Sequence, residues 1–404
     1  MKNDEKSLKP IDNKKILESD KTNKPDKTNK PDKTDKTNES DKPSGSNKTR
    51  VAEKFIFGKS ESNKAKGIAI ILLVFHHLCF MNSFFKTYSM KSILPQRIVV
   101  DMAVLARICV PIFIFISAFG TAKIYIAKKN EMSVFRFICS RLIILMSARW
   151  FIYPFQLLLA YTLRGNTIGS IYKHSFKYAF FDFMGWGDFF KTPMIAGINW
   201  YIFLAQLIII FTPVVCKMIE NYGKASLFFA YILMVLLKGN MVSSFGGDYV
   251  NYIFISILGC LFASECLFDK LKYKHKYILA FSLFVILLGL LYFKRAASYS
   301  KFDYKGTHMV GFAFAALIIC MLVSIFHKNI LLKPLEVLGE YSGNIFYLHI
   351  FVIKCDLLHD KIDSVALLLI VSLVICFILS VIIELIKKLI HFNQFVLFIK
   401  KKIS

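Results

Sequence analysis

The sequence lacks the signatures of several common enzyme classes. It has no Gly-rich phosphate loop, no HExxH pair and no Gly-x-Ser-x-Gly nucleophile elbow. Its nine Cys are scattered, mostly inside apolar runs, with neither paired metal-ligand spacing nor a disulfide framework. We therefore expect no metal site, and we interpret the cysteines as small, buried apolar residues.

Acidic residues are scarce, because 27 Asp and Glu stand against 52 Lys and Arg, giving a formal net charge of +25. In a soluble protein this excess would suggest nucleic-acid binding. Here 55% of the residues are hydrophobic, and the cations cluster between apolar runs. Cytoplasmic loops that follow the positive-inside rule explain the charge better, so we expect no nucleic-acid partner.

Residues 1–60 form a separate region dominated by Lys, Asp, Thr, Asn and Pro. The motif DKTNKP occurs at 20–25 and again at 26–31, and degenerate copies follow. Such a segment cannot bury enough apolar surface to offset its chain entropy, so we expect a disordered cytoplasmic tail. A cleavable signal peptide is not visible, because the N-terminus is long and polar.

Residues 61–404 read as an all-α polytopic membrane domain. Run length and apolar content predict about ten transmembrane helices, and an even number places both termini on one side. The predicted spans lie near 66–86, 98–122, 137–160, 198–218, 225–243, 250–267, 275–293, 308–326, 342–359 and 364–388.

The loop charges orient this topology in a cell membrane. Four alternate loops and the C-terminal segment are rich in Lys and Arg, which places both termini in the cytoplasm. One outer loop disagrees, because it carries Lys294, Arg295, Lys301 and Lys305; this loop could instead contact an anionic glycan. The longest outer loop, 161–197, is rich in aromatic residues and could lie in the membrane interface.

The segment KGIAIILLVFHHLCF, residues 66–80, places two histidines inside an apolar run. An ionisable group deep in a bilayer costs about 2.5 kcal/mol or more, so it usually faces a protein interior. Lys66 and His77 share one helix face, roughly 16 Å apart along the axis, which puts His77 near mid-membrane. His76 points about 100° away.

Further polar residues lie in the next two predicted helices. Arg107 and Arg149 lie within apolar sequence, where a functional or paired role is expected. Arg141 lies near the inner surface, where phosphate binding and positive-inside anchoring explain it equally well. Ser117 could be catalytic or could simply let helices approach closely.

Two later segments complete the candidate site. Trp200 and Tyr201, in INWYIFLAQL, could stack on a sugar or anchor the helix at the interface. In YSGNIFYLHIF, residues 341–351, Tyr347 precedes His349, which reaches a depth similar to that of His77. A lone membrane histidine is often a satisfied interhelical hydrogen bond, but two at matched depth with two arginines favour a polar active cavity.

These segments resemble the membrane acyltransferase-3 family. In that family a cation, ten residues and a histidine open the first transmembrane helix, matched here by Lys66 and His77, with Lys replacing the usual Arg. The run 107–120 is similar to the family's Pro-Phe-rich run ending in Ser-Gly, although Ala118 replaces the Gly. The resemblance extends to INWYIFLAQL and to the late Ser, Tyr, Leu and His element that ends at His349.

The resemblance implies transfer of an acyl group, commonly acetyl, from acyl-CoA to a hydroxyl of a cell-surface or lipid-linked glycan, with no bound cofactor. It implies that Lys66 and Arg141 lie near the CoA phosphates. His77 would act as a general base or a transient acyl carrier, and His349 would orient the site or exchange roles with it. Arg107 or Arg149 would stabilise the oxyanion. The expected substrate contacts are completed by Ser117, Trp200, Tyr201 and Tyr347.

Two other functions remain open at this stage. A transporter or flippase for a glycan or small solute could use the same cavity, although transporters often show internal repeats and we find none here. A non-catalytic membrane scaffold for the tail is the other alternative, and it predicts that substitutions at His77 and His349 are tolerated.

Overall fold

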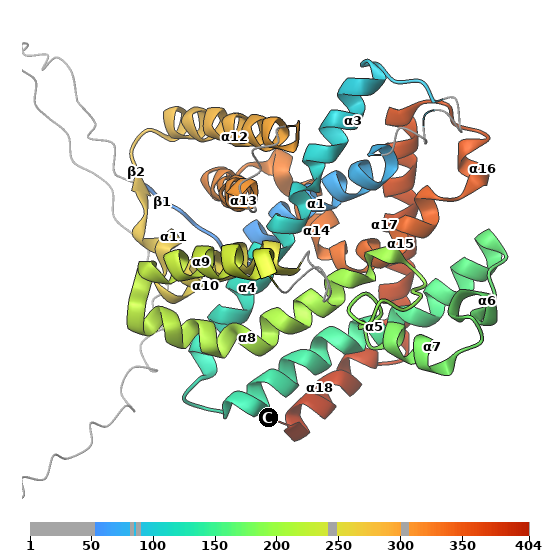
Figure 1. The fold of residues 1–404 in the computed structure, drawn as a ribbon, viewed down its shortest axis with the longest axis horizontal. Helices are drawn as coiled ribbons and strands as arrows, with labels where there is room; N and C mark the ends of the chain where they lie inside the picture. The colour runs from blue at the N-terminus through green and yellow to red at the C-terminus, as the bar shows by residue number, and fades with distance from the viewer. Residues whose placement is uncertain (1–52, 81–84, 86–89, 241–248, 300–306, 404) are drawn as a thin grey trace, which may run out of the picture. The chain divides into compact units, whose positions relative to one another are not determined.

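The computed structural model describes residues 53–80, 85, 90–240, 249–299 and 307–403 (Figure 1). All of them belong to one compact unit, Arg50–Ser404. Most of the predicted disordered tail, the end of the first predicted span after Phe80, and the outer-loop residues Lys301 and Lys305 lie outside the described residues.

The ordered domain includes residues that the sequence assigned to the tail. Strand β1, Glu53–Lys54, pairs antiparallel with β2, Lys272–Tyr273. Just after β1, the Phe57 ring stacks on Phe268 at a centroid distance of 4.6 Å. Burial of Phe55 and Phe57 holds this segment against the helical domain.

The other elements are helical. The longer helices are α1 (Lys59–Cys79), α3 (Gln96–Leu105), α4 (Cys109–Lys128), α5 (Val134–Arg164), α8 (Trp200–Tyr222), α9 (Ser226–Asn240), α10 (Ile253–Ser264), α12 (Lys276–Tyr299), α13 (Thr307–Ile325), α15 (Ser342–Ile353), α17 (Val365–Leu389) and α18 (Phe392–Ile403). The shorter ones are α6 (Ile168–Tyr172), α7 (Phe176–Phe183), α11 (Leu267–Lys270), α14 (Lys333–Glu340) and α16 (Asp356–His359). Single 3₁₀ turns are η1 (Ala106–Ile108), η2 (Gly197–Asn199), η3 (Gly223–Ala225), η4 (Tyr249–Tyr252) and η5 (Ile330–Leu332).

The chain is a helical membrane protein, but the predicted count of about ten spans is not confirmed. Within the described residues, five segments are long and apolar enough to cross a membrane: Gln96–Lys128, Val134–Leu163, Gly197–Leu237, Lys276–Ala296 and Val365–Leu389. Three further apolar helices are shorter, within Tyr249–Ser264, Met309–Ile325 and Ser342–Ile353. One physical reason is that interruptions shorten the runs, as where the predicted 342–359 helix already stops at Ile353.

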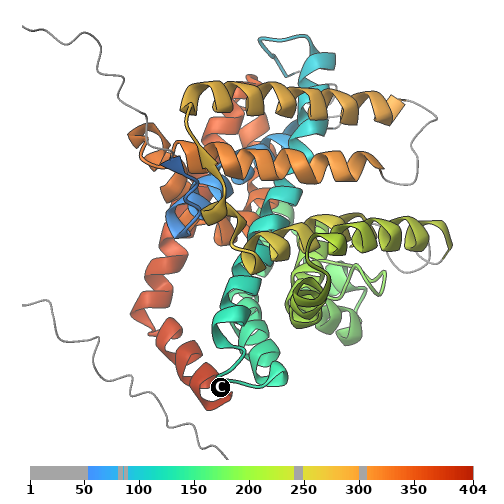
Figure 2. The same ribbon diagram turned by 90° about the vertical axis from the view of Figure 1, so that its left-hand side faces the viewer.

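The lipid-facing side of the bundle is visible in the exposed apolar side chains. Helix α12 exposes 69% of Phe281 and 76% of Tyr292, and α17 exposes 58% of Ile370. So many exposed apolar side chains fit a surface that contacts the hydrocarbon core of a membrane. In Figures 1 and 2, α12 and α13 lie together, away from α5.

Helix α1 crosses α14 at unusually close range, and this crossing fixes its position. A Cβ built on Gly67 would collide with the backbone carbonyl of Leu335, and one built on Gly339 would collide with that of Asn63. The two glycines therefore let the helix backbones touch. This contact fixes the first half of α1. The second half of α1, which contains His76 and His77, packs against α15.

Candidate active site

The centre of the candidate site is a histidine pair from two helices distant in sequence. The rings of His77 on α1 and His349 on α15 have centroids 5.1 Å apart and planes tilted by 41°. The sequence predicts only that the two histidines reach similar depths; the structure places their rings side by side. Helices α1 and α15 pack against each other directly, which positions the pair.

His349 is held in a defined tautomer. Its side chain is fully buried, and Nδ1 lies 2.8 Å from the Phe346 carbonyl oxygen and 3.3 Å from that of Ile345. A carbonyl only accepts hydrogen bonds, so Nδ1 carries the proton. The lone pair is then on Nε2, which has no hydrogen-bond partner among the described residues. This geometry leaves one basic nitrogen available beside His77.

His76 points elsewhere, as the helical angle predicts. Its Nδ1 donates to the Ala103 carbonyl at 2.7 Å, and its ring stacks on Phe80 at 4.9 Å. These contacts tie α1 to the end of α3. His76 therefore joins helices, while His77 faces the candidate site.

A cavity of about 720 Å³ lies between α1, α4, α5, α8 and α15. Five of the six residues predicted to bind substrate line it: Lys66, Ser117, Arg141, Tyr201 and Tyr347. The sixth, Trp200, is not among the described lining residues, and its ring stacks on Tyr252 at 5.7 Å. The structure therefore gathers residues from five separate helices around one space.

One end of this cavity is cationic. Lys59, Lys66, Lys123 and Arg141 line it at the start of α1, the end of α4 and the first turns of α5. None of the four forms an ion pair with a described carboxylate, and Arg141 Nε is buried without a hydrogen-bond partner in that part of the chain. Such an unneutralised set of charges favours an anionic ligand.

The deep end of the cavity is aromatic, and neither His77 nor His349 is among its described lining residues. The Ser117 hydroxyl lies 3.2 Å from that of Tyr201, whose ring is 5.4 Å from Phe346. Phe346 lines the cavity, and its ring centroid is 6.2 Å from that of His349. Phe346 thus separates the cavity from the histidine pair.

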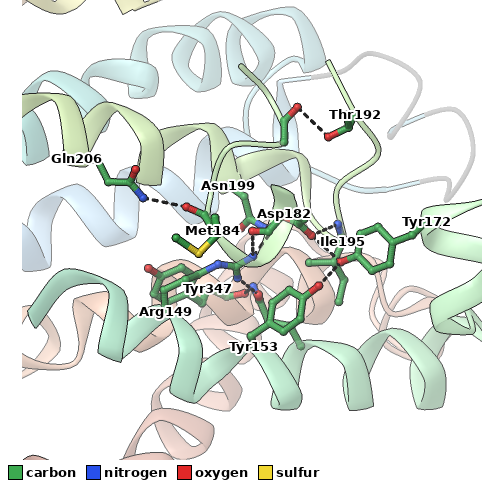
Figure 3. A network of polar contacts seen from close by, with 12 residues as sticks. Arg149, Tyr153, Tyr172, Asp182, Met184, Thr192, Ile195, Asn199, Gln206 and Tyr347 are labelled. Atoms are coloured by element: carbon green, nitrogen blue, oxygen red, sulfur yellow. Dashed lines mark hydrogen bonds and ion pairs between the residues drawn. The ribbon is translucent and has the colours of Figure 1, made fainter. Parts of the chain in front are cut away.

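Arg149 lies in a buried polar network instead of the cavity lining (Figure 3). Its side chain is fully buried, and one guanidinium nitrogen donates to the carboxylate of Asp182 at 3.2 Å and to its carbonyl at 3.1 Å. The ring of Tyr153 lies 4.8 Å beneath the guanidinium. Arg149 is therefore paired, one of the two outcomes expected for an arginine in apolar sequence.

Asp182 is saturated with donors. Its carboxylate accepts from the Tyr172 hydroxyl at 2.6 Å, the Ile195 amide at 2.8 Å and the Asn199 side chain at 2.9 Å (Figure 3). Burial, then the charge of Asp182, raises the pKa of Tyr172 well above its usual value, so Tyr172 stays protonated and keeps donating. The network pins the 165–199 segment onto α5.

The same network reaches the histidine helix. Arg149 also donates to the side-chain oxygen of Gln156, and Gln156 donates to the Tyr347 carbonyl at 2.8 Å. Tyr347 directly follows Phe346, two residues before His349. Neither Asp182 nor Gln156 was identified from the sequence; the one available signal was an acidic residue alone in the aromatic stretch FFDF.

Arg107 lies in the 3₁₀ turn η1 between α3 and α4, and its side chain is exposed. Within the described residues, no cluster of three or more His, Cys, Asp or Glu is arranged to hold a metal ion.

Comparison with known families adds one finding. The family model of acyltransferase-3, described as an acyltransferase domain, matches residues 62–385. No curated protein and no solved structure matches the chain. The matched range includes both histidines and the cavity residues from Ser62 onward, whereas α18 lies beyond it.

Proposed function

Because the chain belongs to the acyltransferase-3 family, we propose that it is a membrane-bound O-acyltransferase. It moves an acyl group, commonly acetyl in this family, from acyl-CoA to a hydroxyl of a cell-surface or lipid-linked glycan. The observation that carries the proposal is the His77–His349 pair, with an unpartnered Nε2, beyond the deep end of a cation-lined cavity.

The cavity suits the donor. Its volume of about 720 Å³ lies within the range of about 300–1,000 Å³ typical of small-molecule sites. Lys66 and Arg141 face the negatively charged phosphates of CoA, while the apolar walls take the pantetheine chain. The acyl thioester then points toward Phe346 and the histidines.

In the proposed mechanism His77 is the general base. In this step a His77 N–H turns toward the lone pair of His349 Nε2, which has no partner in the described structure, and the other His77 nitrogen stays unprotonated toward the acceptor hydroxyl. The hydroxyl oxygen attacks the thioester carbon as His77 takes its proton. When the tetrahedral intermediate collapses, the C–S bond breaks and the proton passes to the departing thiolate, giving CoA and the O-acyl product.

Of the two arginines predicted to stabilise the oxyanion, Arg107 fits better. Arg149 already donates to Asp182 and Gln156 inside a buried network, whereas Arg107 is an exposed cation in the turn η1. We assign Arg149 to holding the site together, and Arg107 to the developing negative charge.

The direction of transfer follows from the loop charges. Both termini and the cationic end of the cavity lie on the cytoplasmic side of the cell membrane, where acyl-CoA is present. The glycan approaches from the opposite face, next to Tyr201 and Trp200 at the start of α8.

Consumption of acyl-CoA separates this proposal from a transporter. Purified protein in proteoliposomes, supplied with acetyl-CoA and an envelope glycan fraction, should release free CoA thiol, measured with a thiol reagent. Release that requires both the glycan and His77 supports the enzyme. Glycan or solute crossing the membrane without any thiol release would support the transporter and overturn the proposal.

A further inference from the structure

Helix α18 packs along α5 although it lies beyond the family match. The rings of Phe392, at the start of α18, and Phe151 have centroids 4.6 Å apart. Figures 1 and 2 show α18 running back beside the first turns of α5, with the C-terminus close to the α4–α5 turn. The two helices are therefore antiparallel at this contact.

The antiparallel register brings Lys400 beside Arg141. Counted from the Phe392–Phe151 contact, Lys400 lies eight residues along α18 and Arg141 ten residues back along α5, or roughly 12 and 15 Å at 1.5 Å per residue. Burial, together with the charges of Lys128 and Arg141, lowers the pKa of Lys400. Lys128, Arg141 and Lys400, from α4, α5 and α18, thus form one cluster of cations.

Within the described residues, none of these three cations forms an ion pair with a carboxylate. Glu220 is instead paired with Lys129 at 2.5 Å and with Lys217 at 3.6 Å. Arg141 Nε is buried without a partner in the described chain. Like charges brought together in this way repel unless an anion neutralises them. Arg141 also lines the donor cavity, so the cluster extends its cationic end.

We propose that α18 completes a phosphate-binding site, formed by Lys128, Arg141 and Lys400, that takes a phosphate of the CoA donor. The assignment rests on the proposed function. An anionic lipid headgroup carries the same chemistry, but the contact with the cavity through Arg141 favours CoA. Lys402, by contrast, is exposed, and its ammonium lies 5.2 Å from the centroid of the Phe398 ring.

The test compares Lys400→Gln with Lys402→Gln in the full-length protein. Each is reconstituted in nanodiscs of phosphatidylcholine alone, and CoA affinity is measured by isothermal titration calorimetry. Lys400→Gln should weaken the Kd about fivefold or more, since a charge-assisted phosphate contact is lost. Lys402→Gln should match wild type, and Lys400→Arg should restore binding.

A second arm identifies the source of the phosphate. In nanodiscs that contain phosphatidylglycerol, native mass spectrometry counts retained anionic lipid. If Lys400→Gln sheds that lipid while CoA affinity stays at the wild-type value, the site belongs to a headgroup and the CoA assignment is overturned. Unchanged lipid and unchanged CoA affinity overturn the phosphate site itself.

The two proposals fail in different ways. Wild type that binds no CoA in either lipid contradicts the donor in the proposed function. Wild type that binds CoA while Lys400→Gln binds equally well contradicts only the role of α18. Equal elution volume and thermal unfolding of all variants control for misfolding.

Discussion

The imidazole rings of His77 and His349 lie 5.1 Å apart, although one belongs to α1 and the other to α15. The neighbouring carbonyls fix the tautomer of His349, and its remaining lone pair is next to His77. A buried pair of this kind is costly in a membrane protein unless it is used. The relationship organises the chemistry proposed for this acyltransferase-3 protein.

The first prediction separates the chemical histidines from the structural one. His349→Ala should lower kcat by about 10²- to 10⁴-fold, the usual contribution of general acid–base catalysis. His76→Ala should keep most of the activity and lower thermal stability, because it loses the Ala103 hydrogen bond and the ring contacts with Phe80 and His77 but no basic nitrogen of the candidate site. Thiol release and thermal unfolding measure the two effects. Comparable loss of kcat in both variants would contradict this division.

The second prediction concerns the buried Arg149–Asp182 pair. Asp182→Ala leaves a fully buried guanidinium without its counter-charge, so it should destabilise the protein by about 3–5 kcal/mol. Replacing both residues by Leu removes both charges and should cost less than Asp182→Ala alone. Denaturant unfolding of the purified protein provides the comparison. A double variant that is no more stable than Asp182→Ala would contradict the cost assigned to the unpaired guanidinium.

A glycine at the α1–α14 crossing gives the third prediction. Gly67→Ala places a methyl group against the Leu335 carbonyl and should separate the helices, lowering both stability and activity. Gly289→Ala on α12 is the matched control, since nothing lies within 4 Å of its Cβ position. That substitution should be neutral or stabilising by up to about 1 kcal/mol. Equal melting temperatures for wild type and Gly67→Ala would rule out the close crossing.

The fourth prediction tests the cationic end of the cavity by kinetics. Arg141→Gln should raise the KM for acetyl-CoA about tenfold or more and leave kcat nearly unchanged, because the lost contact is made equally in the ground and transition states. The KM for the glycan should not move. A fall in kcat at unchanged donor KM would place Arg141 in the chemistry instead.

The sequence predicts those features of the site that depend only on the position of a residue along its helix. The spacing of Lys66 and His77, and the matched depth of His349, depend only on rise per residue and on the side from which each helix starts. The structure places five of the six predicted substrate residues on one cavity because those residues lie on helices that the apolar runs already defined.

Contacts between distant segments could not be predicted in the same way. Asp182 contacts Arg149 because the 165–199 segment folds back onto α5, and no local pattern encodes that return. Contacts between distant segments also explain two of the outer-loop cations that disagreed with the positive-inside rule. Arg295 is paired with Asp101 on α3, and Lys294 lies 5.3 Å from the Phe312 ring, so both are held by the protein itself.

The most direct test of the central claim is incorporation of labelled acetyl from acetyl-CoA into envelope glycans. The glycan label is compared between membranes that carry wild-type protein and membranes that carry His77→Ala at equal protein level. The account predicts label with wild type and none with the variant. Equal label with both would contradict the role of His77, and label with neither, in membranes shown to contain the folded protein and acceptor glycan, would contradict the acetyl-CoA-dependent acyltransferase.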